Sequence, residues 1–172
     1  MTLELAYLIV TGTTTAPRAV ELVQGLLGLV PRVLTLATPN AAQVMAPRDL
    51  SAIPGNRLVE SYFDEAILPR PPDGLVLVAP CSFNSLNKLA AGIADNLALS
   101  LTAEAIGRGT PVIVAPSLNA PLLLHPRAVA SIAALRNWGV SVVDPVDLGD
   151  GPRLAASEVI LAEVKRRLTE TS

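Results

Sequence analysis

Residues 5–10 read Leu5-Ala6-Tyr7-Leu8-Ile9-Val10, and the polar run Thr11-Gly12-Thr13-Thr14-Thr15 follows them directly. An unbroken apolar run of this kind is typical of a strand whose two faces are both covered, as in the interior of a parallel sheet. The polar run marks a loop at the carboxyl end of that strand. The stretch therefore predicts a buried parallel strand that presents hydroxyl groups at one edge of a sheet.

The same alternation continues outward along the chain. Further strands are predicted at 33–37, 75–79, 111–115 and 140–143, and helical spacing of apolar residues is found at 16–29, 84–106, 127–138 and 155–168. The proline-rich segment 46–72 departs from this rhythm, and we expect one short helix there, near 58–67. Alternating strands and helices predict an α/β fold with a parallel sheet, helices on both faces, and ligands beyond the carboxyl ends of the strands.

The composition favours one compact unit with a large core. The chain has 172 residues, of which 51% are hydrophobic and 16% are charged, against a usual charged share of about 25%. This length predicts a single domain over residues 1–172. The excess of apolar residues predicts a homo-oligomer, because one small globule cannot hide so much apolar surface.

Charge and cysteine usage exclude several classes of function. Thirteen Lys and Arg against fifteen Asp and Glu give a net charge of −2, so no broad basic face exists to bind nucleic acid. One cysteine, Cys81, and one histidine, His125, exclude a disulfide framework and most metal sites. An acid at Glu4 argues against a secretory leader, and prolines interrupt the apolar stretch 109–124, so we expect no membrane span and a cytoplasmic location.

Four loops at predicted strand ends are rich in small polar residues, at 11–15, 38–40, 81–85 and 117–119. Their amides and hydroxyls suit a phosphate at a helix N-terminus, where backbone N–H groups lack partners. The glycine spacing of a dinucleotide-binding loop and the Gly-Lys-Ser/Thr of a Walker A loop are both missing. A phosphate-bearing cofactor is one interpretation, and hydroxyls that merely cap helices are the other.

A longer match favours the cofactor. The run Pro80-Cys81-Ser82-Phe83-Asn84-Ser85-Leu86-Asn87-Lys88-Leu89-Ala90-Ala91-Gly92-Ile93-Ala94-Asp95-Asn96-Leu97 resembles Pro-Ala-Ser-Ala-Asn-Thr-x-x-Lys-x-Ala-x-Gly-x-x-Asp-Asn-Leu of the homo-oligomeric flavin-containing cysteine decarboxylases. Gly12-Thr13-Thr14 and Thr38-Pro39-Asn40 stand where that family has its hydroxyl-rich loops. Pro116-Ser117-Leu118-Asn119, followed by Pro126, is similar to its Pro-x-Met-Asn-x-x-Met-Trp-x-x-Pro segment.

The resemblance implies a Rossmann-like or flavodoxin-like three-layer subunit that forms trimers or dodecamers, with FMN bound between subunits. It implies that the FMN phosphate, ribityl chain and ring are held by Gly12, Thr13, Thr14, Thr38, Asn40, Ser82, Phe83, Asn84, Ser85 and Ser117. Asn84 and Asn119 would face the carboxylate of a peptide or small thiol-carboxylate substrate, which an amide N–H binds without titrating.

In this family, FMN oxidises the Cβ–thiol of a cysteine to a thioaldehyde, and carbon dioxide then leaves. This sequence departs from the family pattern twice. Ala66 stands where the family has its active-site histidine, and no second cysteine is present for the reductive flap expected near 148–152. His125, or Tyr62, Asp64 and Glu65 near the vacant position, are the candidates to replace the histidine.

The leading hypothesis is therefore oxidative decarboxylation of a C-terminal peptidyl cysteine to an enethiol, in the biosynthesis of a modified peptide. A catalytically silent FMN-binding oligomer is the alternative, and phosphopantothenoylcysteine decarboxylase and flavin prenyltransferase rank below it. Three other residues have a purely structural interpretation. Lys88 can be a surface residue, Asp95 can be part of a polar turn, and Trp138 can pack in the core or at an interface.

Overall fold

The computed structural model describes residues 3–171. Met1, Thr2 and Ser172, which are the ends of the predicted domain 1–172, lie outside the described part of the chain. Six parallel strands form one sheet in the order β3-β2-β1-β4-β5-β6. They are β1 (Leu5–Val10), β2 (Arg32–Ala37), β3 (Asn56–Leu58), β4 (Leu75–Cys81), β5 (Val112–Pro116) and β6 (Ser141–Val142). A separate antiparallel hairpin is made by β7 (Val146–Asp147) and β8 (Pro152–Arg153).

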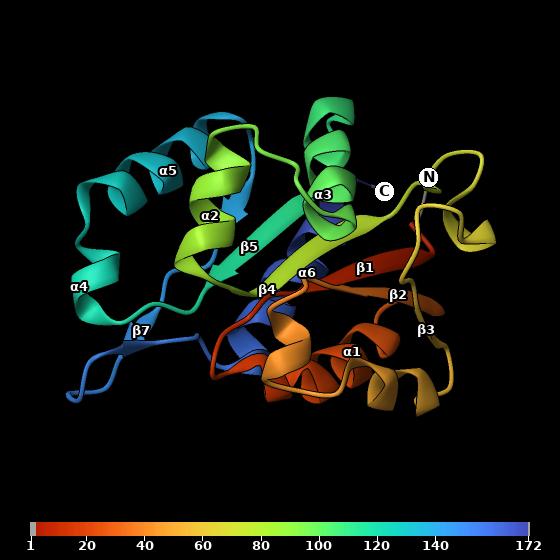
Figure 1. The fold of residues 1–172 in the computed structure, drawn as a ribbon, viewed down its shortest axis with the longest axis horizontal. Coiled ribbons are helices and arrows are strands. Elements are labelled where there is room, and N and C mark those ends of the chain that lie inside the picture. The colour runs from red at the N-terminus through yellow and green to blue at the C-terminus, as the bar shows by residue number, and fades with distance from the viewer. Residues whose placement is uncertain (1–2, 172) are drawn as a thin grey trace.

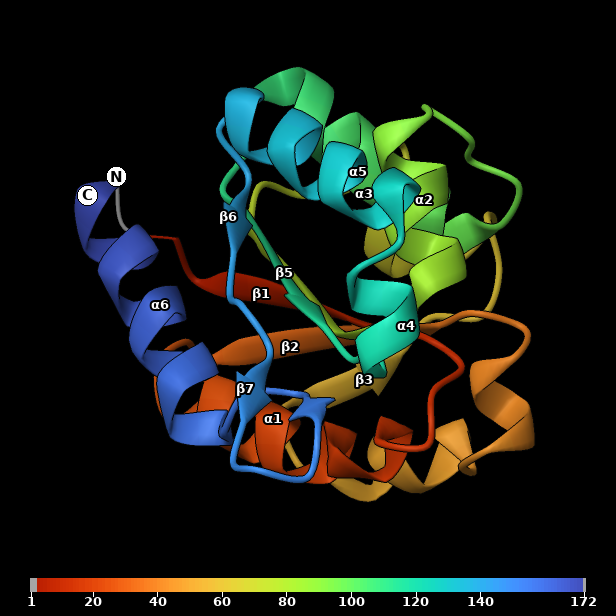
Figure 2. The ribbon, with the colours of Figure 1, turned by 90° about the vertical axis from the view of Figure 1, so that its left-hand side faces the viewer.

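Helices cover both faces of the sheet, which confirms the predicted three-layer α/β fold (Figure 1, Figure 2). One face carries α2 (Phe83–Ala90), α3 (Leu97–Arg108) and α5 (Pro126–Asn137), and the other carries α1 (Ala19–Leu27) and α6 (Ser157–Glu170). The remaining helix, α4 (Ala120–Leu123), is a short turn after β5.

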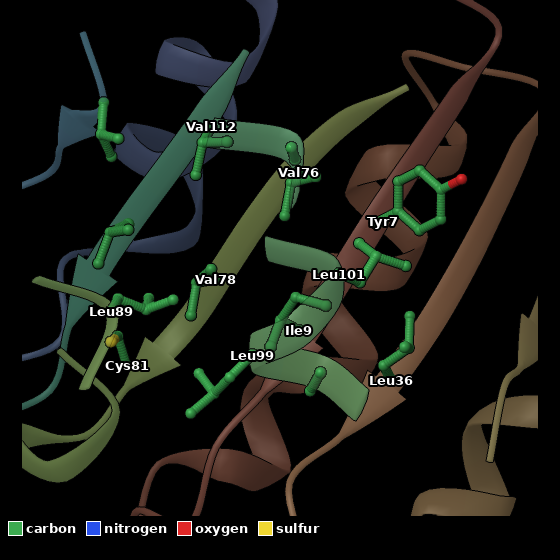
Figure 3. Packing of buried hydrophobic residues seen from close by; sticks show 14 of the residues in the cluster. Tyr7, Ile9, Leu36, Val76, Val78, Cys81, Leu89, Leu99, Leu101 and Val112 are labelled. Carbon is green, nitrogen blue, oxygen red and sulfur yellow. The ribbon is translucent and has the colours of Figure 1, made fainter. Parts of the chain in front are cut away.

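Strand β1 is apolar throughout because both of its faces are buried. Tyr7 and Ile9 pack into the core beneath α2, α3 and α5, whereas Leu8 and Val10 pack into the core beneath α1 and α6. Because successive side chains point to opposite faces of a sheet, every residue of a central strand is buried. Figure 3 shows the first of these cores, which includes Tyr7, Ile9, Val78 and Leu99.

The strand order fixes where a ligand site belongs. From β1 the chain moves outward to β2 and β3, and it then returns to β4 and moves the other way to β5 and β6. The loops after β1 and β4 therefore diverge to opposite sides, and the crevice between them is the usual place for a ligand in such a sheet. Figure 2 looks onto this edge of the sheet, where α2, α4 and β7 also lie.

Two predictions about secondary structure are wrong. The helix expected over 84–106 is two helices, because Gly92 takes a left-handed conformation (φ +71°) after α2 and Asn96 caps a new helix. The helix expected near 58–67 is absent from the described residues, which place there the end of β3 and a 3-10 turn at Glu65–Ile67. The fifth predicted strand, 140–143, is shortened to β6.

Trp138 is half exposed at the end of α5, which contradicts the core interpretation of this residue. Within residues 3–171, no helix is both long and apolar enough to cross a membrane.

Candidate functional site

A buried threonine joins the loops that follow β1 and β4. The Thr11 hydroxyl donates a hydrogen bond to the Pro80 carbonyl oxygen (2.7 Å) and accepts one from the Ser82 backbone amide (2.8 Å). Thr11 is completely buried, so water cannot replace either bond. This one side chain therefore sets the position of Ser82 relative to the end of β1.

Ser82 begins α2 and directs its first turn toward the crevice. Its Oγ accepts a hydrogen bond from the Ser85 amide (3.1 Å) and donates one to the Ser85 hydroxyl (3.1 Å). The amides of Phe83 and Asn84 have no acceptor among the described residues. Free first-turn amides at a helix N-terminus favour an anion, and a phosphate is the usual one.

A cavity of about 260 Å³ lies between α2, the start of α3 and the loops after β1 and β2. It gathers six of the predicted site residues: Gly12, Thr38, Asn40, Ser82, Asn84 and Ser85. The two loops approach closely at Gly12, where a Cβ atom would lie 2.6 Å from the Cβ of Asn40. A second, more apolar cavity of about 190 Å³, lined by Leu36, Leu58 and Val59 among others, shares Thr38 and Pro39 with the first.

A chain of hydroxyls joins the loops after β1 and β5. Thr15 Oγ1 lies 2.9 Å from Thr13 Oγ1 and 2.7 Å from Ser117 Oγ. Thr13 and Ser117 therefore sit together, beside the cavity lining rather than in it. Thr14 is exposed on the same loop.

The remaining predicted residues lie on the far side of α2, at α4 and α5. Asn119 caps α4, since its Oδ1 accepts the Leu122 amide (3.1 Å). His125 caps α5, since its Nδ1 accepts the Arg127 amide (3.0 Å). The His125 ring meets the Phe83 ring edge to face at 5.3 Å, which places the histidine next to the first residue of α2. None of these three residues lines the cavity.

Two charged residues that line the cavity were missed as site residues. Lys88 Nζ lies 2.6 Å from Asp95 Oδ2, and both side chains face the cavity. The hydrogen bond from Lys88 holds the pKa of Asp95 below its ordinary value. The sequence did carry a signal, because Asn84 and Lys88 are four residues apart and so share one face of a helix.

Ala66, where the family histidine was expected, lies at the opposite end of the sheet. It lines a hollow with Leu5, Arg32 and Asn56, which mark the amino ends of β1, β2 and β3. The neighbouring candidates are already engaged: Asp64 and Glu65 pair with Arg57, and the Tyr62 hydroxyl contacts Ser100. Within one subunit, none of them reaches the cavity beside α2.

Cys81 is fully buried at the end of β4, and burial raises the pKa of its thiol. A neutral thiol in the core packs as a small apolar group and is a poor nucleophile.

The donor set of the cavity fits a phosphorylated flavin. Serine hydroxyls, free amides and the Asn40 and Asn84 side chains can bind phosphate and ribityl oxygens without carrying charge.

Comparisons of sequence agree with this fit. A family model described as Flavoprotein matches residues 4–169. A cysteine/cysteine sulfinic acid decarboxylase from an unknown prokaryotic organism is 30% identical over 151 residues, which cover 74% of this chain and 40% of the relative. The coenzyme A biosynthesis bifunctional protein CoaBC of Mycobacterium tuberculosis is 32% identical over 141 residues, which cover 79% of this chain and 33% of the relative. The chain thus spans about two-fifths or less of the length of these two relatives.

A relative of similar length is the probable phosphopantothenoylcysteine decarboxylase of Streptococcus mutans, 30% identical over 176 residues that cover 94% of this chain and 97% of the relative. Among solved structures, the FMN-dependent cysteine decarboxylase SpaF superposes with a TM-score of 0.80 at 24% identity, over 98% of this chain and 96% of that one. HAL3 from Cryptococcus neoformans superposes with a TM-score of 0.77 at 26% identity, over 98% of each chain. The chain therefore belongs to the Flavoprotein family, whose cofactor is a flavin, and within it to the homo-oligomeric flavin-containing cysteine decarboxylases.

Proposed function

We propose that this protein binds FMN beside α2 and oxidatively decarboxylates a C-terminal peptidyl cysteine to an enethiol, in the biosynthesis of a modified peptide. The observation that carries the proposal is the convergence of uncharged donors from three strand-end loops on one cavity next to free α2 amides. Bound FMN would supply the acceptor for the hydride equivalent and proton that leave the substrate Cβ–thiol.

We assign the cofactor contacts to the residues of the strand-end loops. The α2 amides, Ser82 and Ser85 would hold the phosphate, and Thr38 and Asn40 would contact the ribityl chain. The Thr13–Thr15–Ser117 hydroxyl chain, with Thr14 and Phe83 beside it, borders the same edge of the sheet and would extend the contact toward the ring.

The substrate carboxylate would be bound by amide donors. Asn84 lines the cavity, and Asn119 uses only its Oδ1 as a cap, which leaves its Nδ2 free to donate. His125 accepts a hydrogen bond at Nδ1, so in its neutral form the proton is on Nε2 and can be donated. We therefore place His125 as the proton-transferring residue of this otherwise histidine-free chain.

A homo-oligomer, trimeric or dodecameric with FMN at the subunit interface, accompanies this proposal. Exposed apolar side chains support it: Leu124 next to α4 is 75% exposed and Phe63 is 86% exposed. The single buried thiol fits the reducing cytoplasm as the location.

The second candidate is an FMN-binding subunit without activity. It is favoured by the engagement of the sole histidine as a helix cap and by the alanine at position 66, where the family histidine was expected. A complete phosphopantothenoylcysteine decarboxylase is disfavoured, because the β7–β8 hairpin has no cysteine to reduce the enethiol.

Mass spectrometry separates the two candidates. The FMN-loaded protein, incubated with peptides ending in cysteine, is expected to produce a mass loss equal to carbon dioxide plus two hydrogens. The same peptides ending in serine are the control and should stay unchanged. If FMN is bound and no cysteine peptide loses mass, the activity is refuted and the inactive subunit is supported.

A further inference from the structure

The cavity contains an ion pair, Lys88–Asp95, that has no role in capping a helix and none in the proposed reaction. Of the described lining residues these two alone are charged, and their side chains lie 2.6 Å apart. Lys88 is 26% exposed and Asp95 is 50% exposed, so the pair forms part of the cavity rim. Lys88 stands one turn after Asn84 and Ser85, on the face of α2 that points into the cavity.

The pair bridges a turn that has little else to hold it. Residues 91–95 are all exposed, so no apolar side chain of this segment is buried in the core. Backbone bonds fix only its start, where the Ile93 amide donates to the Lys88 carbonyl oxygen (2.9 Å). Farther along, the Ser100 hydroxyl donates to the Ala94 carbonyl oxygen (3.2 Å). The Lys88–Asp95 pair is the side-chain tie from this turn back to α2.

The segment 91–96 also determines where α3 begins. Asp95 precedes Asn96, whose Oδ1 accepts the Leu99 amide (3.0 Å) and caps α3. Asn96 and Leu99 both line the cavity, and Leu99 is also part of the core. A displacement of Asp95 therefore moves the wall that α3 contributes to the cavity.

We infer that Lys88 and Asp95 are a positioning pair, which holds the turn 91–96 against α2 and so sets the affinity of the cavity for a phosphorylated flavin. The inference rests on the proposed function for the identity of the ligand. It does not assign Lys88 to the phosphate itself, because its ammonium is already bound to the ionised Asp95 carboxylate.

Two measurements on four variants of the pair and one control variant test the inference. FMN affinity is measured by fluorescence titration for the unaltered protein, Lys88→Met, Asp95→Asn and the double variant, with Lys88→Arg as the conservative variant. Asp144→Asn is the matched control, because Asp144 forms a similar exposed pair with Arg136 (2.8 Å) away from the cavity. Hydrogen exchange of the segment 91–96 is measured on the same proteins without flavin.

The positioning role predicts that Lys88→Met and Asp95→Asn each weaken FMN binding about three- to fivefold and that the double variant is no weaker than either. Lys88→Arg and Asp144→Asn should keep the affinity of the unaltered protein. Exchange of 91–96 should accelerate in Lys88→Met and Asp95→Asn and stay unchanged in Asp144→Asn.

Tighter or equal binding by Asp95→Asn, with a steeper dependence on salt, would overturn the inference in favour of direct phosphate binding by Lys88. Failure of the unaltered protein to bind FMN would refute the proposed function instead. In that case the hydrogen exchange of 91–96 in Lys88→Met and Asp95→Asn decides on the pair. Faster exchange supports the positioning role, and unchanged exchange overturns it.

Discussion

Replacing Gly12 by valine is expected to abolish useful FMN binding, with an affinity at least about 100-fold weaker, or about 2.7 kcal/mol. Even a Cβ atom at this position would lie 2.6 Å from the Asn40 Cβ and 2.9 Å from the Asn40 backbone carbon. Backbone cannot yield as a flexible side chain does, so the loops at Gly12 and Asn40, which both line the cavity, must move apart. Overpacking of this kind also costs about 1–3 kcal/mol of unfolding free energy.

Gly107→Ala is the matched control for this substitution. Gly107 lies in α3, and a Cβ there meets nothing within 4 Å. Alanine should leave FMN affinity unchanged and raise the unfolding free energy by about 0.5–1 kcal/mol, because glycine is the poorer helix former. Titration with FMN and denaturant unfolding measure both effects. If Gly12→Val binds FMN as the unaltered protein does, the close approach of the two loops is not part of the flavin site.

Replacing Thr11 by valine is expected to lower both the stability of the protein and its affinity for FMN. Valine matches the shape of threonine, but it leaves the partly buried Ser82 amide without its acceptor and removes one donor from the Pro80 carbonyl oxygen. The Pro80 oxygen keeps a weaker bond from the Thr11 amide (3.3 Å), so the main cost is the orphaned Ser82 amide, about 1–3 kcal/mol of unfolding free energy. Because that amide lies one residue before α2, FMN affinity should fall at least about tenfold as well.

Thr11→Ser retains the hydroxyl and controls for the loss of the methyl group. It should keep most of the FMN affinity of the unaltered protein, although a small cavity in the core lowers its stability. Equal affinity of Thr11→Val and Thr11→Ser would show that the hydroxyl does not position α2 for the flavin.

The sheet could be predicted because burial on both faces leaves a plain mark in the sequence. Leu5–Val10 and Leu75–Cys81 are central strands, so neither contains the alternating polar residues of a half-exposed strand. The convergence of the loops after β1, β2 and β4 also followed, since parallel strands end at one edge.

The elements that were missed depend on distant contacts. Asn56 in β3 is held by Thr35 (2.8 Å) and by the Leu50 carbonyl oxygen (2.8 Å), and no local pattern reveals such a pair. The break between α2 and α3 did have local signals in Gly92 and Asn96, but the apolar spacing ran on through both and concealed it.

The place of the candidate site could be predicted in part, because polar loops follow recognisable strands and end at one edge of the sheet. Gly12 and Asn40 stand in two of these loops and line the cavity, and their assignment to the cofactor came from the resemblance to the family. Lys88 shares a helix face with Asn84, but its pairing with Asp95 could not be predicted, because the pair spans a turn where the sequence predicted one continuous helix. His125 was a candidate because it is the one histidine of the sequence, whereas its contact with Phe83 depends on how α5 packs against α2.

The most direct test is to identify what the purified protein carries. After gentle purification, the protein is denatured and the released small molecule is analysed by absorption and chromatography. We predict a yellow protein that releases FMN in equal amount to the chain. A colourless protein that also fails to bind added FMN would contradict the assignment of this strand-end cavity to a flavin.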